Sequence, residues 1–578
     1  MLREIRGSLL FFLALCQWGM KSLTNLFNKS NRALLLSAAA VSITLFAADN
    51  PSYFWQPYDE SLEISEQAVH PNSQLRYKLL NSKVLDKNDL WRPFEAALRD
   101  FSAQRYESLK PLILERSIAE LQQSVREGQI NYEELVSFYL YRIRHFESDN
   151  SLSLNSVITL NPNAINRAQE LDQLRQQGNA VANDSIYGMP VLLKDNVGAE
   201  GMPTTAGAIA LRNNFTDDAF ITSRLKANGA IILGKANLSE WAYFFCDDCP
   251  SGYSAMGGQT LNPYGRKQFG TGGSSSGSAV AVAANFAVAA VGSETSGSIL
   301  SPASANSVVG LKPTTGLLSR SGVVPISSTL DTTGPIAKSV ADSVILFNAM
   351  TGYDENDLAM PLISADYSLD YSVNSIGDKR LGVINGFAGD GMYTDAVASL
   401  NQAGAILVEV DMASARFEGF GNLLGGEMKR DLALYLEQYA SGRVEIETID
   451  DVKVFNEASL ELRAPYGQAE VDRMVTNEQS MDALNRLRDR LQSQARDQLE
   501  SVFTEFDLDI LVSINNRHAG IAALANFPAI TLPMGYLGTG QPVGLTLIAP
   551  PFHEQDLIDS AAVYEQAGET RVVPSSYQ

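Results

Sequence analysis

Glycine and serine residues gather in two short segments that could carry nucleophilic chemistry. The first reads G270-T-G-G-S-S-S-G-S and leads into an alanine-rich stretch, and the second reads V291-G-S-E-T-S-G-S and follows an apolar run. Glycine lets the backbone turn tightly, and N–H groups at such a turn or at the start of a helix are free to bind an anion. A serine beside them could attack a carbonyl group while they stabilise the oxyanion.

The first segment has three interpretations when it is taken alone. A phosphate-binding loop would need a G-K-[S/T] ending, which is absent. A G-x-S-x-G nucleophile elbow would use Ser275, but an elbow follows a hydrophobic strand and needs a later histidine, which only His518 or His553 could supply. The third interpretation is a flexible glycine-serine loop without chemistry.

Lys194 is a candidate general base at the end of the apolar run that begins at Pro190. Most lysines are solvated, and the position alone favours that interpretation. At the dry end of a buried strand, however, an ammonium group loses hydration and can become a neutral base. The chemistry therefore depends on which strand ends and turns the fold brings together.

Short apolar runs alternate with helical stretches through the middle of the chain, as in P190-V-L-L-K, A230-I-I-L-G-K and A287-V-A-A-V-G-S. This alternation predicts an α/β fold with a largely parallel sheet. Ser117 and Asn131 are each followed three residues later by glutamate, which predicts two helix starts. We predict an N-terminal extension at residues 49–116, helix-like from Leu90 to Arg116, and a catalytic domain at residues 117–578 with a helical insert at about 425–505.

Lys194 and the two serine segments, in this order along the chain, resemble the amidase signature family. The resemblance covers about residues 117–549, most of the chain, and implies the amidase-signature fold, an α/β fold with a large mixed, mostly parallel central sheet flanked by helices. Further matches are G234-K-A-N-L-S-E-W-A, G257-G-Q-T-L-N-P-Y, V309-G-L-K-P-T-T-G, D331-T-T-G-P and P528-A-I-T-L-P.

The resemblance implies a serine amidase that works through an acyl-enzyme without histidine, metal or cofactor. It places the nucleophile at Ser298, a bridging serine, usually in a cis peptide bond, at Ser274, and the base at Lys194. The resemblance also suggests Ser275 as a supporting residue and the backbone N–H groups of Thr295, Ser296 and Gly297 as the oxyanion hole.

The form E294-T-S-G-S-I resembles the peptide amidase branch, whereas many family members carry D-x-G-G-S-I-R. We therefore predict hydrolysis of peptide C-terminal amides or small organic carboxamides. Two alternatives stay open: an amidotransferase-type subunit that acts on charged tRNA, and a noncatalytic binding protein with the amidase fold.

The composition limits which partners this protein is expected to bind. The formal net charge is -22, and so acidic a chain repels the phosphate backbone of nucleic acids. After removal of an N-terminal segment only Cys246 and Cys249 would remain of the three cysteines. A zinc site would need two further ligands, so a loop disulfide or two ordinary thiols are favoured over a metal.

The charge and apolar pattern of residues 1–48 predicts a signal peptide or an N-terminal membrane segment. A basic stretch after Met20 precedes the apolar run from Ala33 to Ala48, and an earlier apolar stretch leaves the start codon at Met1 or Met20. A buried N-terminal helix is the alternative. We predict an exported protein, periplasmic or secreted, with membrane attachment through this segment as a second outcome. The basic residues are Arg3, Arg6, Lys21, Lys29 and Arg32, against Glu4 alone.

Overall fold

The computed structural model describes residues 53–178, 181–361, 363, 366–372, 375–412, 416–568 and 570–578. The predicted signal or membrane segment lies outside the described residues, and export stays a prediction. The elements discussed below lie in the compact unit of residues Tyr53–Phe101 and Arg105–Gln578, except that the helix at residues 103–113 begins two residues before its second part. Within the described residues, no helix is both long and apolar enough to cross a membrane.

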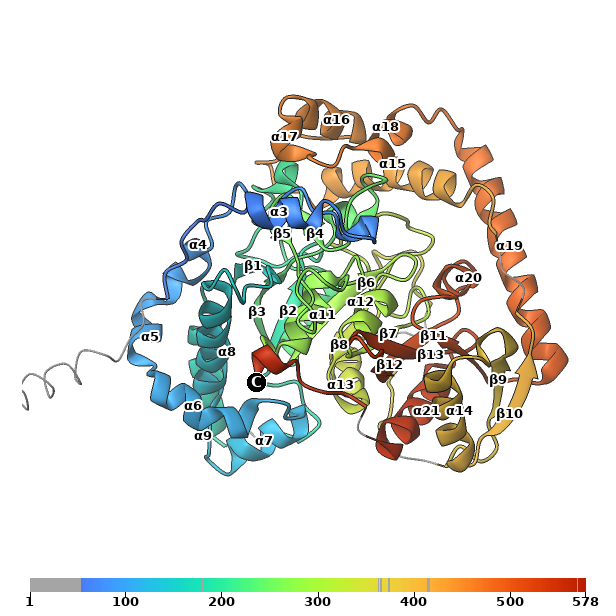
Figure 1. Cartoon of the computed structure of the whole chain (residues 1–578), viewed down its shortest axis with the longest axis horizontal. Coiled ribbons are helices and arrows are strands. Elements are labelled where there is room, and N and C mark those ends of the chain that lie inside the picture. The colour runs from blue at the N-terminus through green and yellow to red at the C-terminus, as the bar shows by residue number, and fades with distance from the viewer. Residues whose placement is uncertain are drawn as a thin grey trace, which may run out of the picture. The chain divides into compact units, whose positions relative to one another are not determined.

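A single large sheet of 11 strands runs through the described part of this unit (Figure 1). Its strand order is β1-β3-β2-β6-β8-β7-β12-β13-β11-β9-β10. The strands are β1 Val157–Leu160, β2 Pro190–Lys194, β3 Ile231–Ala236, β6 Ala289–Glu294, β7 Val309–Lys312, β8 Thr332–Ala337, β9 Arg380–Ile384, β10 Ile406–Val410, β11 Ile510–Ile514, β12 Ala529–Tyr536 and β13 Pro542–Ile548, and β4 Tyr253–Ser254 pairs separately with β5 Gly258–Gln259.

The mixed α/β sheet is confirmed, but it is not mostly parallel. Strand β2 is parallel to both β3 and β6, and β9 is parallel to both β10 and β11. The other six pairings of the described sheet are antiparallel. Apolar runs mark buried strands without fixing their direction, and only the parallel pairs require a crossover such as the helices that follow β2 and β3.

Helices cover the sheet, and their starts follow the predicted capping signals. Ser117 and Asn131 each accept a hydrogen bond from the backbone N–H three residues on, and the glutamate there bonds back, so both capping boxes are formed. The helices are α7 Ile118–Arg126, α8 Tyr132–Glu147, α9 Ala164–Gln176, α10 Phe220–Ala227, α11 Ser276–Ala283, α12 Leu300–Ala305, α13 Val340–Met350, α14 Gly391–Gln402, α20 Ala519–Ala525 and α21 Glu554–Ala567.

The stretch from Leu90 to Arg116 in the predicted N-terminal extension is largely helical, as expected, and consists of several short helices. Pro93 lies in a single 3-10 turn after α4, and Phe101 takes an extended conformation that ends α5. Proline supplies no backbone N–H to continue a helix, which explains the break after α4. The helices are α3 Ser61–Gln67, α4 Asn88–Trp91, α5 Glu95–Asp100 and α6 Ala103–Ile113.

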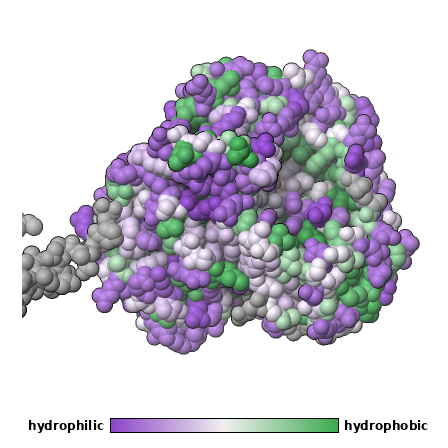
Figure 2. Space-filling model, in the orientation of Figure 1, coloured by the Kyte–Doolittle hydropathy of each residue, from purple (hydrophilic) through white to green (hydrophobic). Residues whose placement is uncertain are grey.

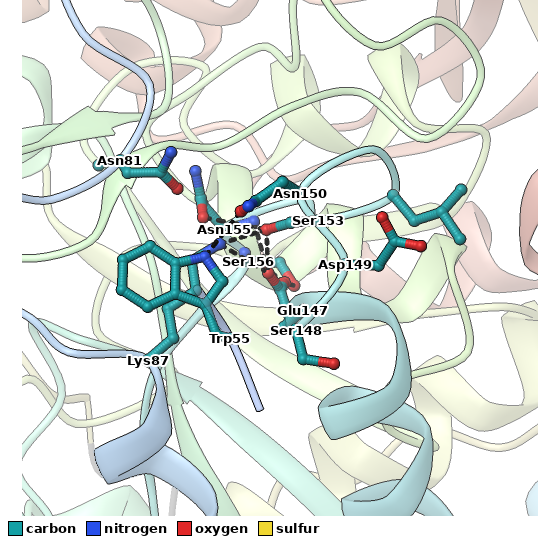
Figure 3. A network of polar contacts seen from close by, with 12 residues as sticks. Trp55, Asn81, Lys87, Glu147, Ser148, Asp149, Asn150, Ser153, Asn155 and Ser156 are labelled. Carbon is teal, nitrogen blue, oxygen red and sulfur yellow. Dashed lines mark hydrogen bonds and ion pairs between the residues drawn. The ribbon is translucent and has the colours of Figure 1, made fainter. Parts of the chain in front are cut away.

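A buried polar network fastens this extension to α8 and to the loop before β1 (Figure 3). Lys87 donates to Ser153 Oγ and lies 3.7 Å from the carboxylate of Glu147. The indole of Trp55 donates to Asn150 Oδ1 at 2.7 Å. A charge removed from water is tolerated when it is paired and hydrogen-bonded, so these contacts fix the extension in one place.

The predicted helical insert contains five helices with apolar residues buried between them. They lie together in orange beside and above the sheet (Figure 1). The loop of Cys246 and Cys249, joined by a disulfide with 5.6 Å between the Cα atoms, contacts this insert where Phe245 O accepts from Glu470 N. The helices are α15 Phe420–Gln438, α16 Ile449–Glu457, α17 Leu460–Arg463, α18 Ala469–Val475 and α19 Met481–Phe506.

Candidate active site

Lys194 is the last residue of β2, between the parallel strands β3 and β6, and its side chain is fully buried. Its Nζ contacts Ser274 Oγ at 2.7 Å, Ser293 Oγ at 2.9 Å and the Ser293 carbonyl oxygen at 3.1 Å. Because the carboxyl ends of parallel strands meet at one edge of a sheet, Ser293, near the end of β6, lies beside the lysine.

Burial lowers the pKa of Lys194 from 10.5 to about 7, against the opposing effect of the carboxylates of Asp331 and Glu294. The carboxylate next in the chain does not contact Lys194. Asp195 lies 3.3 Å from Lys235 and accepts from Thr205, so its charge is compensated elsewhere. An amine that loses its proton near neutral pH can act as a general base, which the geometry also favours.

Ser274 stands between the lysine and the second serine segment. Its peptide bond with Gly273 is cis, as the family resemblance implies. Its carbonyl oxygen accepts from Ser239 N at 3.0 Å, which anchors the loop before α11. Ser274 is fully buried, and its hydroxyl lies within hydrogen-bond distance of Lys194 Nζ.

Ser298 lies in the turn between β6 and α12 and is 9% exposed. Its carbonyl oxygen accepts from Ser275 N at 3.1 Å, which brings the two serine segments together. Among the hydrogen bonds of the described residues, none joins Ser298 Oγ to Ser274 Oγ. The predicted relay therefore has its Lys194–Ser274 link formed, and the link to Ser298 remains a prediction; such links often tighten only when substrate binds.

Ser275 supports the site and is poorly placed to be the nucleophile. Its Oγ donates to Ser293 O at 3.0 Å and accepts from Ser293 N at 3.2 Å, so both functions of the hydroxyl are used on β6. The two histidines that an elbow would need have other partners. His518 bonds to Ser513 and His553 bonds to Asp556.

The predicted oxyanion hole needs one correction. The backbone N–H of Gly297 donates to Glu294 Oε1 at 2.7 Å and is not free to bind an oxyanion. Glu294 Oε2 also accepts from Ile299 N and Leu300 N, so this buried carboxylate holds the whole turn. Within the described residues, the N–H groups of Thr295 and Ser296 have no such partner, and they stay the predicted donors.

Three residues near the lysine were not singled out by the sequence. Glu294 stood out only as a departure from the usual aspartate, although its longer side chain can reach back to the N–H groups of its own turn. Ser293 lies in the second serine segment and Asn196 follows Lys194 by two residues, but neither spacing nor residue type shows that Asn196 Nδ2 donates to Ser293 Oγ at 3.0 Å. That contact joins residues far apart in the chain.

A cavity of about 170 Å³ lies beside the nucleophile turn, and Asp331 is the link between them. Asp331 Oδ1 accepts from Thr295 Oγ1 at 2.6 Å, and the same residue lines the cavity. On the face drawn in Figure 2 the surface is hollowed below the helices of the insert. The other lining residues include Arg320, Ser327, Asp431, Tyr435 and Tyr439.

The described residues contain no group of three or more His, Cys, Asp or Glu side chains arranged to hold a metal ion.

A family model, a curated relative and two solved structures that match this chain are all named as amidases. The Amidase family model matches residues 134–516. A probable amidase of Arabidopsis thaliana is 35% identical over 484 residues, which are 80% of this chain and 92% of that protein. The crystal structure of an amidase family protein from Bacillus anthracis superposes with a TM-score of 0.80 at 36% identity, covering 86% of this chain and 99% of that one. The peptide amidase PAM in complex with the competitive inhibitor chymostatin has a TM-score of 0.74 at 36% identity, covering 80% and 99%.

Proposed function

The chain belongs to the amidase signature family and is a hydrolase of C–N bonds, and from this premise we propose that it hydrolyses the terminal carboxamide of peptides or of small organic amides. The observation that carries the proposed mechanism is the buried Lys194, whose amine lies 2.7 Å from Ser274 Oγ. A lysine in that position can remove a proton through Ser274 without any histidine.

The proposed reaction has two halves. Ser298 Oγ attacks the amide carbonyl carbon while its proton passes to Ser274 and the Ser274 proton passes to Lys194. The N–H groups of Thr295 and Ser296 stabilise the oxyanion. Lys194 then returns a proton through Ser274 to the leaving nitrogen, the C–N bond breaks, and water cleaves the acyl ester by the same route, giving a carboxylic acid and ammonia or an amine.

Similarity to a peptide amidase that binds chymostatin supports a peptide or amide substrate. The form E294-T-S-G-S-I points the same way, since it resembles the peptide amidase branch. The cavity beside Asp331 takes part of its wall from α15 of the insert, through Asp431 and Tyr435.

We expect ammonia release from an amidated dipeptide, and little or no cleavage of internal peptide bonds in the same dipeptide with a free carboxyl terminus. Ammonia needs little room on the leaving side, whereas an internal bond places chain there. The assay measures ammonia from the dipeptide amide beside the anilide and the free acid. Efficient endopeptidase cleavage would contradict the substrate proposal, and a purified protein that matures glutamyl-tRNA instead would favour the amidotransferase alternative.

The pH dependence follows from the direction of the lysine shift. Burial holds the pKa of Lys194 at about 7, and only the neutral amine accepts a proton, so activity is lost as pH falls through 7 and retained above it. We expect kcat/KM to fall about tenfold per pH unit well below pH 7 and to level off above about pH 8. Initial rates between pH 5 and pH 9 test this, and a flat profile over that range would rule out a neutral lysine base.

A further inference from the structure

The end of the β6–β8 pairing places Asp331 opposite the nucleophile turn. The antiparallel register pairs Glu294 with Thr332 as its last pair. The next two residues, Thr295 and Asp331, therefore face each other just beyond the paired strands, and Thr295 Oγ1 donates to Asp331 Oδ1 at 2.6 Å. Because the backbone N–H of Thr295 is one of the two predicted oxyanion donors, this contact fixes the residue that carries the donor.

Asp331 is itself held by the loop that precedes it. Its Oδ2 accepts from the backbone N–H groups of Ile326 at 2.8 Å and Ser327 at 2.9 Å. Burial raises the pKa of Asp331 to about 6, and the hydrogen bonds from Thr295 and from the two loop N–H groups oppose that rise. At about pH 8 the group is therefore a carboxylate that can only accept, and the threonine hydroxyl is the donor.

Helix α15 of the insert holds the same loop from its other side. The hydroxyl groups of Ser327 and Thr329 both donate to the carboxylate of Glu427, which is 1% exposed. The backbone N–H of Ser328 donates to Asp431, one turn further along α15, at 2.7 Å. The loop is therefore fastened to the insert and, through the aspartate that ends it, fastens the nucleophile turn.

Two carboxylates divide the work of fixing this turn. Glu294 anchors its later part, where it accepts from the N–H group of Gly297 and from two N–H groups that follow Ser298. Asp331 anchors its first residue, Thr295. An oxyanion donor must lie about 2.7–3.1 Å from the place where the charge develops, so a small displacement of this residue weakens stabilisation of the transition state.

We propose that Asp331 and Ser327 are positioning residues that connect α15 of the insert to the N–H group of Thr295 and so hold this donor in place for the oxyanion. The inference rests on the proposed function, because it assigns a role only if this turn binds an oxyanion. It adds no reacting group to the mechanism.

Thr295→Val tests the contact at the turn. Valine has the shape of threonine and keeps the backbone N–H, but it cannot donate to Asp331. At about pH 8 we expect kcat for the dipeptide amide to fall about tenfold, less than the 10²–10³-fold cost of a lost donor. KM is expected to stay within about twofold, because the oxyanion forms only after attack. Thr295→Ser restores the hydroxyl and is expected to keep most of the activity.

Rates are expressed per competent site, counted from the extent of fluorophosphonate labelling at completion. A merely structural contact would change the amount of folded protein and leave kcat per site and KM unchanged. If Thr295→Val does not fold, Thr295→Ala removes the same hydroxyl with a smaller side chain and enters the same comparison.

A dipeptide aldehyde gives a second measure of the oxyanion donors. Ser298 Oγ adds to the aldehyde carbon, the C=O bond becomes a single bond, the serine proton passes through Ser274 to Lys194, and nothing leaves. The new oxyanion lies where the reaction places it. The inhibition constant, read from the slowing of fluorophosphonate labelling, is expected to rise about tenfold in Thr295→Val, in step with the loss of kcat.

Ser327→Ala tests the connection to the insert. It removes the hydroxyl that donates to Glu427 and leaves the backbone N–H that donates to Asp331. We expect kcat per site to fall about threefold, the effect of one hydrogen bond. Added to Thr295→Val it is expected to cost nothing further, since the path is already interrupted at the turn. Such non-additivity is the evidence that a contact path requires.

Ser319→Ala is the matched control. Ser319 and Ser327 are both fully buried, and each hydroxyl donates to a carboxylate, that of Ser319 to Asp354 at 2.6 Å. Each also accepts a backbone N–H at 3.1 Å, from Ser321 and Leu330 respectively. Ser319→Ala is therefore expected to cost similar stability, with kcat per site and the aldehyde inhibition constant unchanged.

The outcomes separate the claims. An unaltered protein that binds the aldehyde but releases no ammonia overturns the proposed function, and the aldehyde measurements still decide this inference. If Thr295→Val keeps both its kcat per site and its aldehyde inhibition constant, the positioning role is overturned. If Ser327→Ala lowers kcat by the same factor with and without Thr295→Val, or if Ser319→Ala lowers it equally, the connection to the insert is overturned.

Discussion

Ser298→Ala is expected to lower amide hydrolysis by at least about 10⁴-fold, the largest effect of any single substitution in this chain. The substitution removes the atom that forms the acyl bond, and neither Ser274 nor Ser275 can replace it, since the first lies on Lys194 and the second has its hydroxyl engaged on β6. Steady-state ammonia release measures the loss.

Covalent labelling by a fluorophosphonate gives an independent measure of the same serine. The unaltered enzyme is expected to react and Ser298→Ala is not, whereas Ser275→Ala should still be labelled, at a lower rate. If Ser275→Ala lost all labelling and Ser298→Ala kept it, the nucleophile elbow would be the correct interpretation. No labelling of the unaltered protein would favour a noncatalytic binding protein.

Lys194→Met is expected to have the second largest effect, a loss of about 10³-fold or more in kcat/KM. Methionine fills the buried volume without a base, so the protein should fold. Because the lysine and the nucleophile act in one step, adding Lys194→Met to Ser298→Ala is expected to cost almost nothing further.

Lys194→Arg is the companion to that experiment. A guanidinium keeps its proton at every accessible pH, so arginine retains the charge but supplies no base. It is expected to be as inactive as methionine at pH 7 and not to recover at pH 9. Recovery of either variant above half of the original rate would show that another group removes the proton.

The sequence predicted the parts of the site whose chemistry is local. Lys194 ends an apolar run, and this run forms β2. The glycine-serine segment leads into α11, and Ser298 follows β6. Each of these depends on a short pattern that fixes a strand end or a helix start within a few residues. The capping serine and asparagine of α7 and α8 were predictable for the same reason.

Contacts between distant segments were harder to predict. Asn196 and Ser293 come from the ends of two strands, and the hydrogen that joins them depends on side-chain rotation that no spacing reveals. The free N–H groups of the nucleophile turn could be counted from sequence, but not the reach of Glu294, which occupies the N–H of Gly297. The predicted strand directions were also wrong. Buried strands are apolar whether they are parallel or antiparallel, so the sequence does not distinguish the two.

The pairing of β7 with β12 affects how the chain folds while it is being synthesised. Thr531 pairs with Gly310 and Ala529 with Lys312, so β7 is an inner strand only in the finished protein. On a ribosome that adds about 5–20 residues per second, β7 waits on the order of 10–40 seconds for its neighbour. During that time the half-sheet that carries the active site ends in an unpaired edge, which is a template for strands of other nascent chains. Fast overexpression should therefore aggregate this enzyme during synthesis, and slowing translation or supplying a chaperone should raise its yield more than stabilising the finished fold.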